Sequence, residues 1–262
     1  MSFTADWLAL REPVDHRSRN RRVADAVRAH FSGKSGVTVL DLGAGTGANL
    51  RATMPLLQRP QRWIMVDNDP TLLQRITATD STIEIIREER DLATDLRSVL
   101  TGAPVSLVTA SSLFDLVSAP WLEQLVGFLA ERRLPLYATL IYTGTERWLP
   151  LHPADGAMLS AFLRDQRRDK GFGPALGPDA WNWLVTLLEA RGYHIVIGPS
   201  DWQLTSADGP LIRALAGEIA AAAHREGGLP PEHIEDWHSA RNTALGCAIG
   251  HKDVFAVPGG GR

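Results

Sequence analysis

The sequence contains few features of a secreted or membrane protein. Its 262 residues include one cysteine, Cys247, which cannot form a disulfide within the chain, and no Cys/His cluster has the spacing of a zinc site. The longest apolar runs, such as residues 134–142, are too short to cross a bilayer. Residues 1–10 lack the basic segment and apolar stretch that begin a secretory signal. We therefore expect a soluble, cytoplasmic protein without a resident metal.

The chain also lacks an excess of charge of either sign. Lys and Arg number 27 against 30 Asp and Glu, so the net charge is -3. Such a balance provides no long-range attraction for nucleic acid or for an anionic membrane. Residues 105–111 contain no Asn/Asp-Pro-Pro-Tyr motif, and Cys247 lies outside any Pro-Cys motif, so the usual signatures of base-methylating enzymes are missing. We expect a small-molecule partner, no nucleic-acid or membrane partner, and a monomer or homodimer.

What the sequence does contain is an alternation of short β-rich runs and helix-length segments. Hydrophobic residues make up 44% of the chain, enough to bury one core in a single domain of residues 1–262. The alternation predicts a parallel sheet with helices on both faces. We therefore expect a three-layer, doubly wound α/β fold with a seven-stranded, mostly parallel sheet. Its expected strands are residues 37–42, 62–66, 82–87, 105–110, 135–142, 193–199 and one within 245–257.

Other segments flank or interrupt this alternation. Residues 1–33 are expected to form a helical N-terminal cap, with an amphipathic helix over residues 15–31. Residues 37–142 are expected to be the cofactor-binding half. After the fifth and sixth strands, two insertions break the rhythm with proline and glycine, and we expect residues 143–178 and 206–242 to form helical lids over a substrate.

A glycine-rich turn follows the first expected strand. Residues 39–50 read V-L-D-L-G-A-G-T-G-A-N-L. Gly43, Gly45 and Gly47 would let the chain approach a ligand closely at the end of this strand. Because Ala48 also completes a G-x-G-x-x-A pattern, the glycines alone do not decide between a dinucleotide and a cofactor without phosphate.

Two carboxylates near the turn bear on that choice. Asp41 stands two residues before the first glycine, where its charge would repel a pyrophosphate and suit an ammonium group. Asp67, followed by Asn68, ends the second strand, where it would either accept hydrogen bonds from both ribose hydroxyls or cap the helix that begins at Pro70. No tyrosine is followed four residues later by a lysine, as a short-chain dehydrogenase requires. These features favour an ammonium-bearing cofactor over a dinucleotide.

On these residues, the sequence resembles the class I, Rossmann-like methyltransferase family. The glycine-rich first motif of that family is similar to residues 39–47, and the resemblance extends over residues 37–142. It implies that the cofactor is S-adenosyl-L-methionine and that the product is S-adenosyl-L-homocysteine.

The resemblance also implies roles for residues beyond the turn. Asp91 would accept from the exocyclic amine of adenine, with Leu92 against the ring, although an acid at this position is also a common helix cap. Ala110 and Ser111 would lie near the reacting methyl group, and Arg19 would pair with the cofactor carboxylate. The expected cofactor-binding residues are Arg19, Asp41, Gly43, Ala44, Gly45, Gly47, Asp67, Asn68, Asp91, Leu92, Ala110 and Ser111.

Candidate catalytic residues lie at and after the end of the fifth strand. In-line methyl displacement needs no general acid, and it needs a base only when the nucleophile keeps its proton. The candidates are Tyr142, His152, Asp155, Asp165 and Lys170, of which we favour the first three. His152 is the best single choice for a base; its alternative role is a partly buried histidine bonded to backbone. The polar segment 164–173 would be either a loop that binds a carboxylate or phosphate or a solvated helix face.

These observations lead to three hypotheses about function. The first is a methyltransferase that moves a methyl group to an oxygen or nitrogen of a small molecule of anionic or aromatic character. Trp148, Trp202 and Trp237 would then stack on a planar substrate or enclose a cationic amine. The second is a protein that binds S-adenosylmethionine for regulation without methylating, and the third, least favoured, is an NAD(P)-dependent oxidoreductase.

Overall fold

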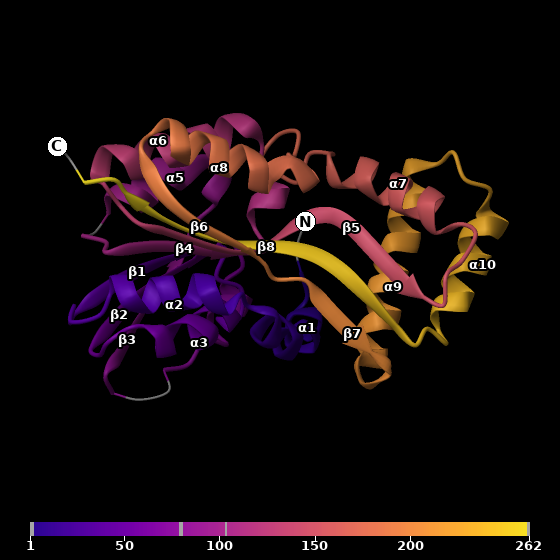
Figure 1. The fold of residues 1–262 in the computed structure, drawn as a ribbon, viewed down its shortest axis with the longest axis horizontal. Coiled ribbons are helices and arrows are strands. Elements are labelled where there is room, and N and C mark those ends of the chain that lie inside the picture. The colour runs from indigo at the N-terminus through magenta and orange to yellow at the C-terminus, as the bar shows by residue number, and fades with distance from the viewer. Residues whose placement is uncertain (1–2, 79–80, 103, 261–262) are drawn as a thin grey trace.

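The computed structural model describes residues 3–78, 81–102 and 104–260, which fold around one mixed β-sheet (Figure 1). Its eight strands include seven in the order β3-β2-β1-β4-β5-β8-β6, and β7 pairs with β8 beside that path. The first five of these run parallel, whereas β8 is antiparallel to β5, β6 and β7. The strands are β1 (Val37–Leu42), β2 (Gln61–Asp67), β3 (Ile83–Glu89), β4 (Leu107–Ser111), β5 (Leu136–Leu149), β6 (Tyr193–Pro199), β7 (Trp202–Thr205) and β8 (Gly246–Pro258).

Helices cover both faces of the parallel strands. The α-helices are α1 (Ala5–Ser18), α2 (Arg21–His30), α3 (Ala48–Thr53), α4 (Pro70–Leu73), α5 (Leu92–Thr101), α6 (Ala119–Arg132), α7 (Asp155–Gln166), α8 (Ala180–Ala190), α9 (Gly209–Glu226) and α10 (Pro231–Arg241). In Figure 1, α5, α6 and α8 lie on one side of the sheet, and α2 and α3 lie on the other. Leu40 of β1 packs in an apolar cluster with residues of α6, whereas its neighbour Val39 packs in a different cluster with residues of α2. Burial on both faces explains why inner strands such as β1 and β2 are mostly apolar.

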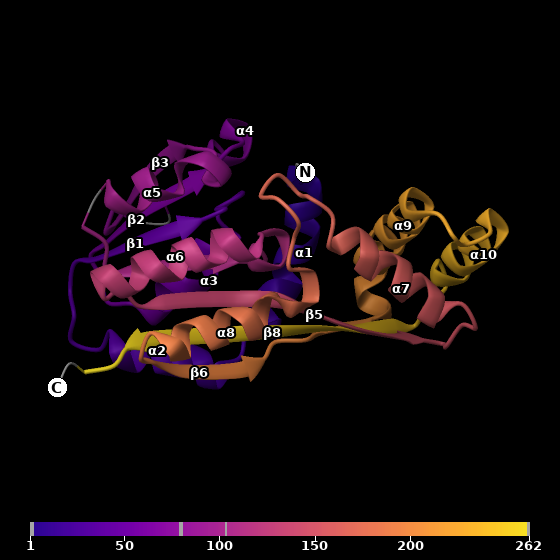
Figure 2. The ribbon, with the colours of Figure 1, turned by 90° about the horizontal axis from the view of Figure 1, so that it is seen from above.

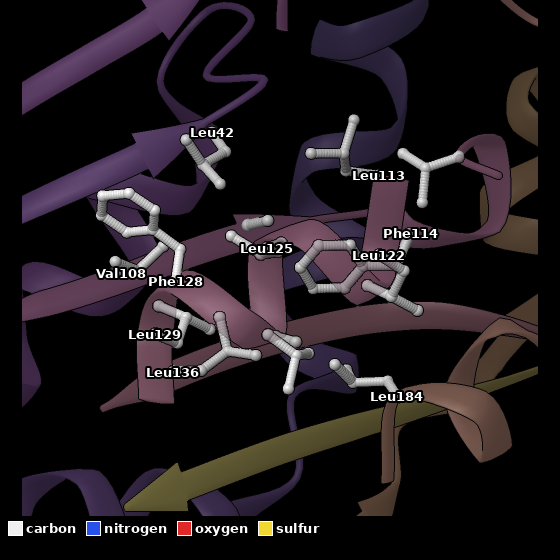
Figure 3. Close-up of a cluster of buried hydrophobic side chains, with 14 of the residues drawn as sticks. Leu42, Val108, Leu113, Phe114, Leu122, Leu125, Phe128, Leu129, Leu136 and Leu184 are labelled. Carbon is white, nitrogen blue, oxygen red and sulfur yellow. The ribbon is translucent and has the colours of Figure 1, made fainter. Parts of the chain in front are cut away.

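The apolar cluster beneath α6 fixes the inner strands of the sheet (Figure 3). Leu122, Leu125 and Leu129 of α6 are fully buried, and the cluster that they form includes Val108 of β4 and Leu136 of β5. Burying each leucine contributes about 2 kcal/mol to stability. The carboxyl ends of these strands, where the candidate site lies, are therefore built on a densely packed support.

The predicted fold class is confirmed, with two corrections to its elements. The sheet is mostly parallel and carries helices on both faces, but it has one strand more than the predicted seven. We missed β7 because four residues, alternately buried and exposed, make too short a pattern to be distinctive. The single helix predicted over residues 15–31 is wrong: α1 and α2 are separate helices. Asn20 begins α2, because its side-chain oxygen accepts from the N–H of Val23 at 3.1 Å.

Strands β5 and β8 continue past the parallel part of the sheet and carry a second packed unit. β5 runs to Leu149, beyond the predicted end at Tyr142. Helices α7, α9 and α10, together with β7 and the outer parts of β5 and β8, enclose an apolar cluster that contains Trp148, Trp202 and Trp237. We call this unit the helical extension; both views show it at the opposite end of the molecule from β3 (Figures 1 and 2).

The two predicted lid insertions supply the helices of this extension. Residues 143–178 contain the outer part of β5 and all of α7, and residues 206–242 contain α9 and α10. In Figure 2, the segment that returns from α7 to α8 approaches the N-terminal end of α1. No helix in the described ranges is long and apolar enough to cross a membrane.

A buried carboxylate holds the place where β5 bends. Pairing with β8 is irregular across residues 138–141, where Leu140 has a φ of 54°, in the left-handed region that is costly for a side chain. Asp253 of β8 is fully buried and accepts from the N–H of Leu140 at 2.9 Å through one oxygen and from the N–H of Asn20 at 2.8 Å through the other. Burial raises the pKa of this carboxyl. Asp253 therefore fixes both the bend of β5 and the start of α2.

Candidate cofactor site

The glycine-rich turn leaves the carboxyl end of β1 in a conformation that glycine adopts most readily. The φ angle is 50° at Gly45 and 83° at Gly47. A Cβ atom on Gly45 would lie 3.1 Å from Cδ1 of Leu8, and one on Gly47 would lie 3.1 Å from Cγ2 of Ile76. The turn is thus packed between α1 and the segment after α4, and a larger residue would displace a neighbour.

Asp67, at the end of β2, holds this turn from the neighbouring strand. Its Oδ2 accepts from the N–H of Gly45 at 2.8 Å, and its Oδ1 accepts from the N–H of Asp69 at 3.0 Å. The cap of α4 is Asp69 rather than Asp67. The N–H of Gly45 is therefore committed to a carboxylate within the protein.

A buried polar network lies behind the turn. The Nδ2 atom of Asn49 donates to Oδ1 of Asp41 at 2.6 Å and to Oγ1 of Thr109 at 3.0 Å. Nη2 of Arg19 donates to Oδ1 of Asn49 at 3.0 Å and to Oγ of Ser111 at 3.4 Å. Complete burial raises the pKa of Asp41 to about 7, although the bond from Asn49 opposes the shift. Among the described residues, Oδ2 of Asp41 and both Nε and Nη1 of Arg19 are buried without a hydrogen-bond partner.

A cavity of about 260 Å³ opens over the turn. Its walls bring together residues from the carboxyl ends of β1, β2, β3 and β4, as expected at the edge of a doubly wound sheet. Asp91 lines the cavity and also caps α5, accepting from the N–H of Ala93 at 2.9 Å, so its two predicted roles are compatible. The predicted cofactor residues that line the cavity are Gly43, Ala44, Gly45, Asp67, Asn68, Asp91, Leu92 and Ser111.

The remaining predicted cofactor residues do not line the cavity. They are Arg19, Asp41, Gly47 and Ala110. Gly47 closes the turn, because its N–H donates to the carbonyl of Ala44 at 2.9 Å. Ala110 is packed in the apolar core of the sheet. Asp41 and Arg19 reach the cavity wall only through the hydrogen-bonded network behind the turn.

Comparison with known proteins adds evidence at the level of the fold. No family model matches the chain, and no curated protein sequence matches it. Among solved structures, the cyclopropane synthase MmaA2 from Mycobacterium tuberculosis is similar with a TM-score of 0.53 and 11% identity, over 97% of this chain and 94% of that chain. The YcgJ protein from Bacillus subtilis is similar with a TM-score of 0.51 and 13% identity, over 92% and 100%. A cyclopropane-fatty-acyl-phospholipid synthase-like protein from Lactobacillus casei is similar with a TM-score of 0.50 and 13% identity, over 97% and 94%.

These likenesses, the order of the strands and the position of the glycine turn decide the fold. The chain has the class I, Rossmann-like methyltransferase fold.

In this class I fold, the three predicted catalytic residues lie outside the cavity. The O–H of Tyr142 donates to Glu146 at 2.9 Å, and burial, followed by the nearby Glu146 charge, raises the pKa of this phenol. Asp155 accepts from the backbone N–H of His152 at 2.8 Å and from Nε1 of Trp237 at 2.7 Å. The prediction assumed that the insertion closes over the strand ends. Residues 170–172 of the insertion do line the cavity, whereas β5 and β8 carry His152 and Asp155 into the helical extension. The proposed site therefore does not include Tyr142, His152 or Asp155.

The tryptophans predicted to stack on a substrate are buried in the helical extension. Trp148, Trp202 and Trp237 are each at most 4% exposed. The rings of Trp148 and Trp237 meet edge to face at 5.3 Å, and Nε1 of Trp202 donates to Asp15 at 3.0 Å. The stacking prediction is wrong, because these side chains form a core rather than a ligand surface.

One wall of the cavity was missed by sequence reasoning, and α1 supplies it. Leu8, Arg11 and Asp15 line the cavity together with Phe3, which precedes the helix. Their spacing along α1 is helical and was the available signal, but Pro13 weakened the helical pattern of this segment. Ser112, Leu113 and Leu116 also line the cavity and were not among the predicted site residues. Lys170 and Phe172 line it too, and both belong to the polar segment 164–173, for which a loop that binds a carboxylate or phosphate was one of the two predictions.

We expect Asp41→Asn to change how the stability of this fold depends on pH. The pKa of Asp41 is raised from 3.8 to about 7, so the folded state holds a proton that the unfolded state releases between these values. Stability from this group is complete below pH 3.8 and is lost as the pH rises through about 7. The free energy of unfolding of the natural protein, minus that of Asp41→Asn, should therefore fall by up to about 1.4 kcal/mol per pH unit in this window.

Urea unfolding at a series of pH values measures this difference. Asp25→Asn is the control, because Asp25 is an exposed carboxylate paired with Arg28 on the surface. Its curve should run parallel to that of the natural protein. If the Asp41→Asn curve were also parallel, the raised pKa would be refuted.

Proposed function

We propose that this protein is an S-adenosylmethionine-dependent methyltransferase that moves a methyl group to an oxygen or nitrogen of a small molecule. The observation that carries the proposal is the bond from the N–H of Gly45 to Asp67. In a dinucleotide site, the N–H groups of the glycine turn bind a pyrophosphate, and a carboxylate in that position would repel one. A carboxylate suits a ribose, and the cavity is lined also by Asp69 and Asp91.

The buried atoms without partners test whether this cofactor fits. Its methionine end carries an ammonium group and a carboxylate. Within the described part of the chain, one carboxylate oxygen of Asp41 and two guanidinium nitrogens of Arg19 have no hydrogen-bond partner. Both side chains bond to Asn49, which lines the cavity. Asp41 and Arg19 thus lie directly behind Asn49 and carry charges opposite to those of the ammonium group and the carboxylate. The residues present therefore fit the cofactor.

The side chains around the cavity would bind and orient the cofactor and exclude water from its reacting methyl group. When bound, the cofactor supplies an electrophilic methyl group on a sulfur that departs as a neutral thioether. Asp67 and Asp91 would hold the ribose and the adenine, and Leu92 would pack against the ring. Leu8, Leu113 and the backbone at Ser111 would surround the methyl group and exclude water. Positioning and dehydration supply most of the rate enhancement in such a displacement.

Ligand-dependent stability and product formation test the proposal. At about 100 times its dissociation constant, S-adenosylhomocysteine should stabilise the protein by about 2.7 kcal/mol, and NAD should leave the melting temperature unchanged. Incubation with methyl-labelled cofactor and a metabolite extract should label a small molecule. Binding without any labelled product would favour a non-methylating role, and stabilisation by NAD alone would refute the proposal.

A further inference from the structure

Two cations line the cavity outside the glycine turn. They belong to a set of lining residues that we call the acceptor end, which consists of Arg11, Ser112, Leu116, Lys170 and Phe172. They come from α1, from the segment after β4, and from the segment between α7 and α8. None of these residues belongs to the glycine turn, and none is among the carboxylates assigned to the ribose and adenine.

Arg11 is held rigidly with part of its guanidinium unoccupied. Its Nε and Nη2 donate to the two oxygens of Asp15 at 2.9 and 3.3 Å, and Nη2 also donates to Oγ of Ser112 at 2.6 Å. The guanidinium lies over the ring of Trp202, 5.1 Å from its centroid, and Nε1 of that ring donates to Asp15 at 3.0 Å. Asp15 is therefore fully engaged in orienting Arg11. In the described part of the chain, Nη1 of Arg11 bonds to nothing and remains available to a ligand in the cavity.

Lys170 adds a second, largely buried cation, which shares its carboxylate with an arginine. Its side chain is 6% exposed, and Nζ donates to Oδ2 of Asp165 at 2.9 Å. The same carboxylate pairs with Arg225, whose Nε lies 3.1 Å from Oδ1. Arg225 is 46% exposed, and Glu218 and Glu226 also lie near it, so its charge does not depend on Asp165 alone. Nζ of Lys170 has N–H bonds that Asp165 does not use, and an anion in the cavity can accept them.

The rest of the acceptor end is apolar. The ring of Phe172 is held by an edge-to-face contact with Trp121, with centroids 5.6 Å apart. Leu116 provides a second apolar surface in the same cavity. The positive sulfonium expected near Ser111 would repel Arg11 and Lys170. An anionic group between the sulfonium and these side chains would offset that repulsion.

We propose that the acceptor end binds an anionic oxygen group, a carboxylate or a phosphate, on a small acceptor whose apolar body packs against Phe172 and Leu116. Arg11 binds the group through Nη1, and Lys170 binds it through the N–H bonds that Asp165 leaves unused. Asp15 and Ser112 act as positioning residues for Arg11. This inference rests on the proposed methyltransferase function, because that function places the methyl group at the Ser111 side of the cavity.

The test is to titrate benzoate, phenyl phosphate and the neutral benzamide into protein saturated with S-adenosylhomocysteine and to measure binding by NMR. One of the two anions should bind at least about tenfold more tightly than benzamide, and the stronger anion identifies the group. Lys170→Met and Arg11→Met should each remove most of this preference, whereas Lys170→Arg should retain it. The dissociation constant of S-adenosylhomocysteine should change less than about threefold in all of them.

Arg167→Met is the matched control, because Arg167 is an exposed cation of the same segment that pairs with Asp179 and does not line the cavity. It should bind all three probes as the natural protein does. Equal binding of benzoate, phenyl phosphate and benzamide would overturn the inference while S-adenosylhomocysteine binding upheld the proposed function. A large loss of S-adenosylhomocysteine affinity in Arg11→Met would also overturn it, because Arg11 would then bind the cofactor. Failure of the natural protein to bind S-adenosylhomocysteine would refute the proposed function itself.

Discussion

Replacing Asp67 with alanine is expected to weaken S-adenosylhomocysteine binding about a hundredfold. The substitution removes the carboxylate that would accept from the ribose hydroxyls. It also frees the N–H of Gly45, which now donates to Asp67 at 2.8 Å, so the glycine turn loses its support from β2. Both losses act on the same ligand, because the turn and the carboxylate form adjoining walls of the cavity. Isothermal titration calorimetry of the purified variant measures the effect.

Glu84→Ala is the control for this experiment. Glu84 lies near the amino end of β3, whereas the cavity lies at the carboxyl ends of the strands, and it pairs with Arg62 on the surface. Its removal should leave cofactor affinity within about twofold, since exposed ion pairs contribute little to stability. If Asp67→Ala bound S-adenosylhomocysteine as tightly as Glu84→Ala did, the ribose assignment of Asp67 would be wrong.

Replacing Asp253 with alanine is expected to lower the free energy of unfolding by about 3 kcal/mol. This carboxylate satisfies the N–H groups of Leu140 and Asn20 in the interior, and alanine would leave both without an acceptor. Leu140 would also keep its left-handed backbone without the bond that holds it. Urea or thermal unfolding, monitored by circular dichroism, measures the change.

Asp201→Ala offers a matched comparison. Asp201 accepts from the N–H of His251 on β8 at 2.9 Å, but its side chain is exposed, so water can replace it. Its removal should cost only about 1 kcal/mol. Equal losses in the two variants would show that burial of Asp253 has no special role at the bend of β5.

The parallel half of the fold was predictable because local patterns encode it directly. The apolar runs that became β1, β2 and β4 are buried on both faces, and the glycine turn has to follow the first of them. Parallel strands bring their carboxyl ends to one edge, so Asp67, Asp91 and Ser111 could be placed together without any knowledge of side-chain contacts.

The remaining features depend on contacts between residues distant in sequence. The bend of β5 is fixed by Asp253, which lies more than a hundred residues later, so no local pattern shows that His152 and Asp155 would be carried into the helical extension. These two residues lie outside the cavity, and their catalytic role stays a prediction. Arg11 escaped notice for a related reason, because its partner Ser112 lies 101 residues later in the chain.

Helix α1 presents two adjacent stripes to two different parts of the molecule. Trp7, Leu10 and Val14 pack in the core of the helical extension, whereas Leu8 and Arg11 line the cavity. A ligand that grips the second stripe also stabilises the docking of the first. Such a coupling is reciprocal, so a substitution that loosens the extension is expected to weaken binding of that ligand by the same coupling free energy.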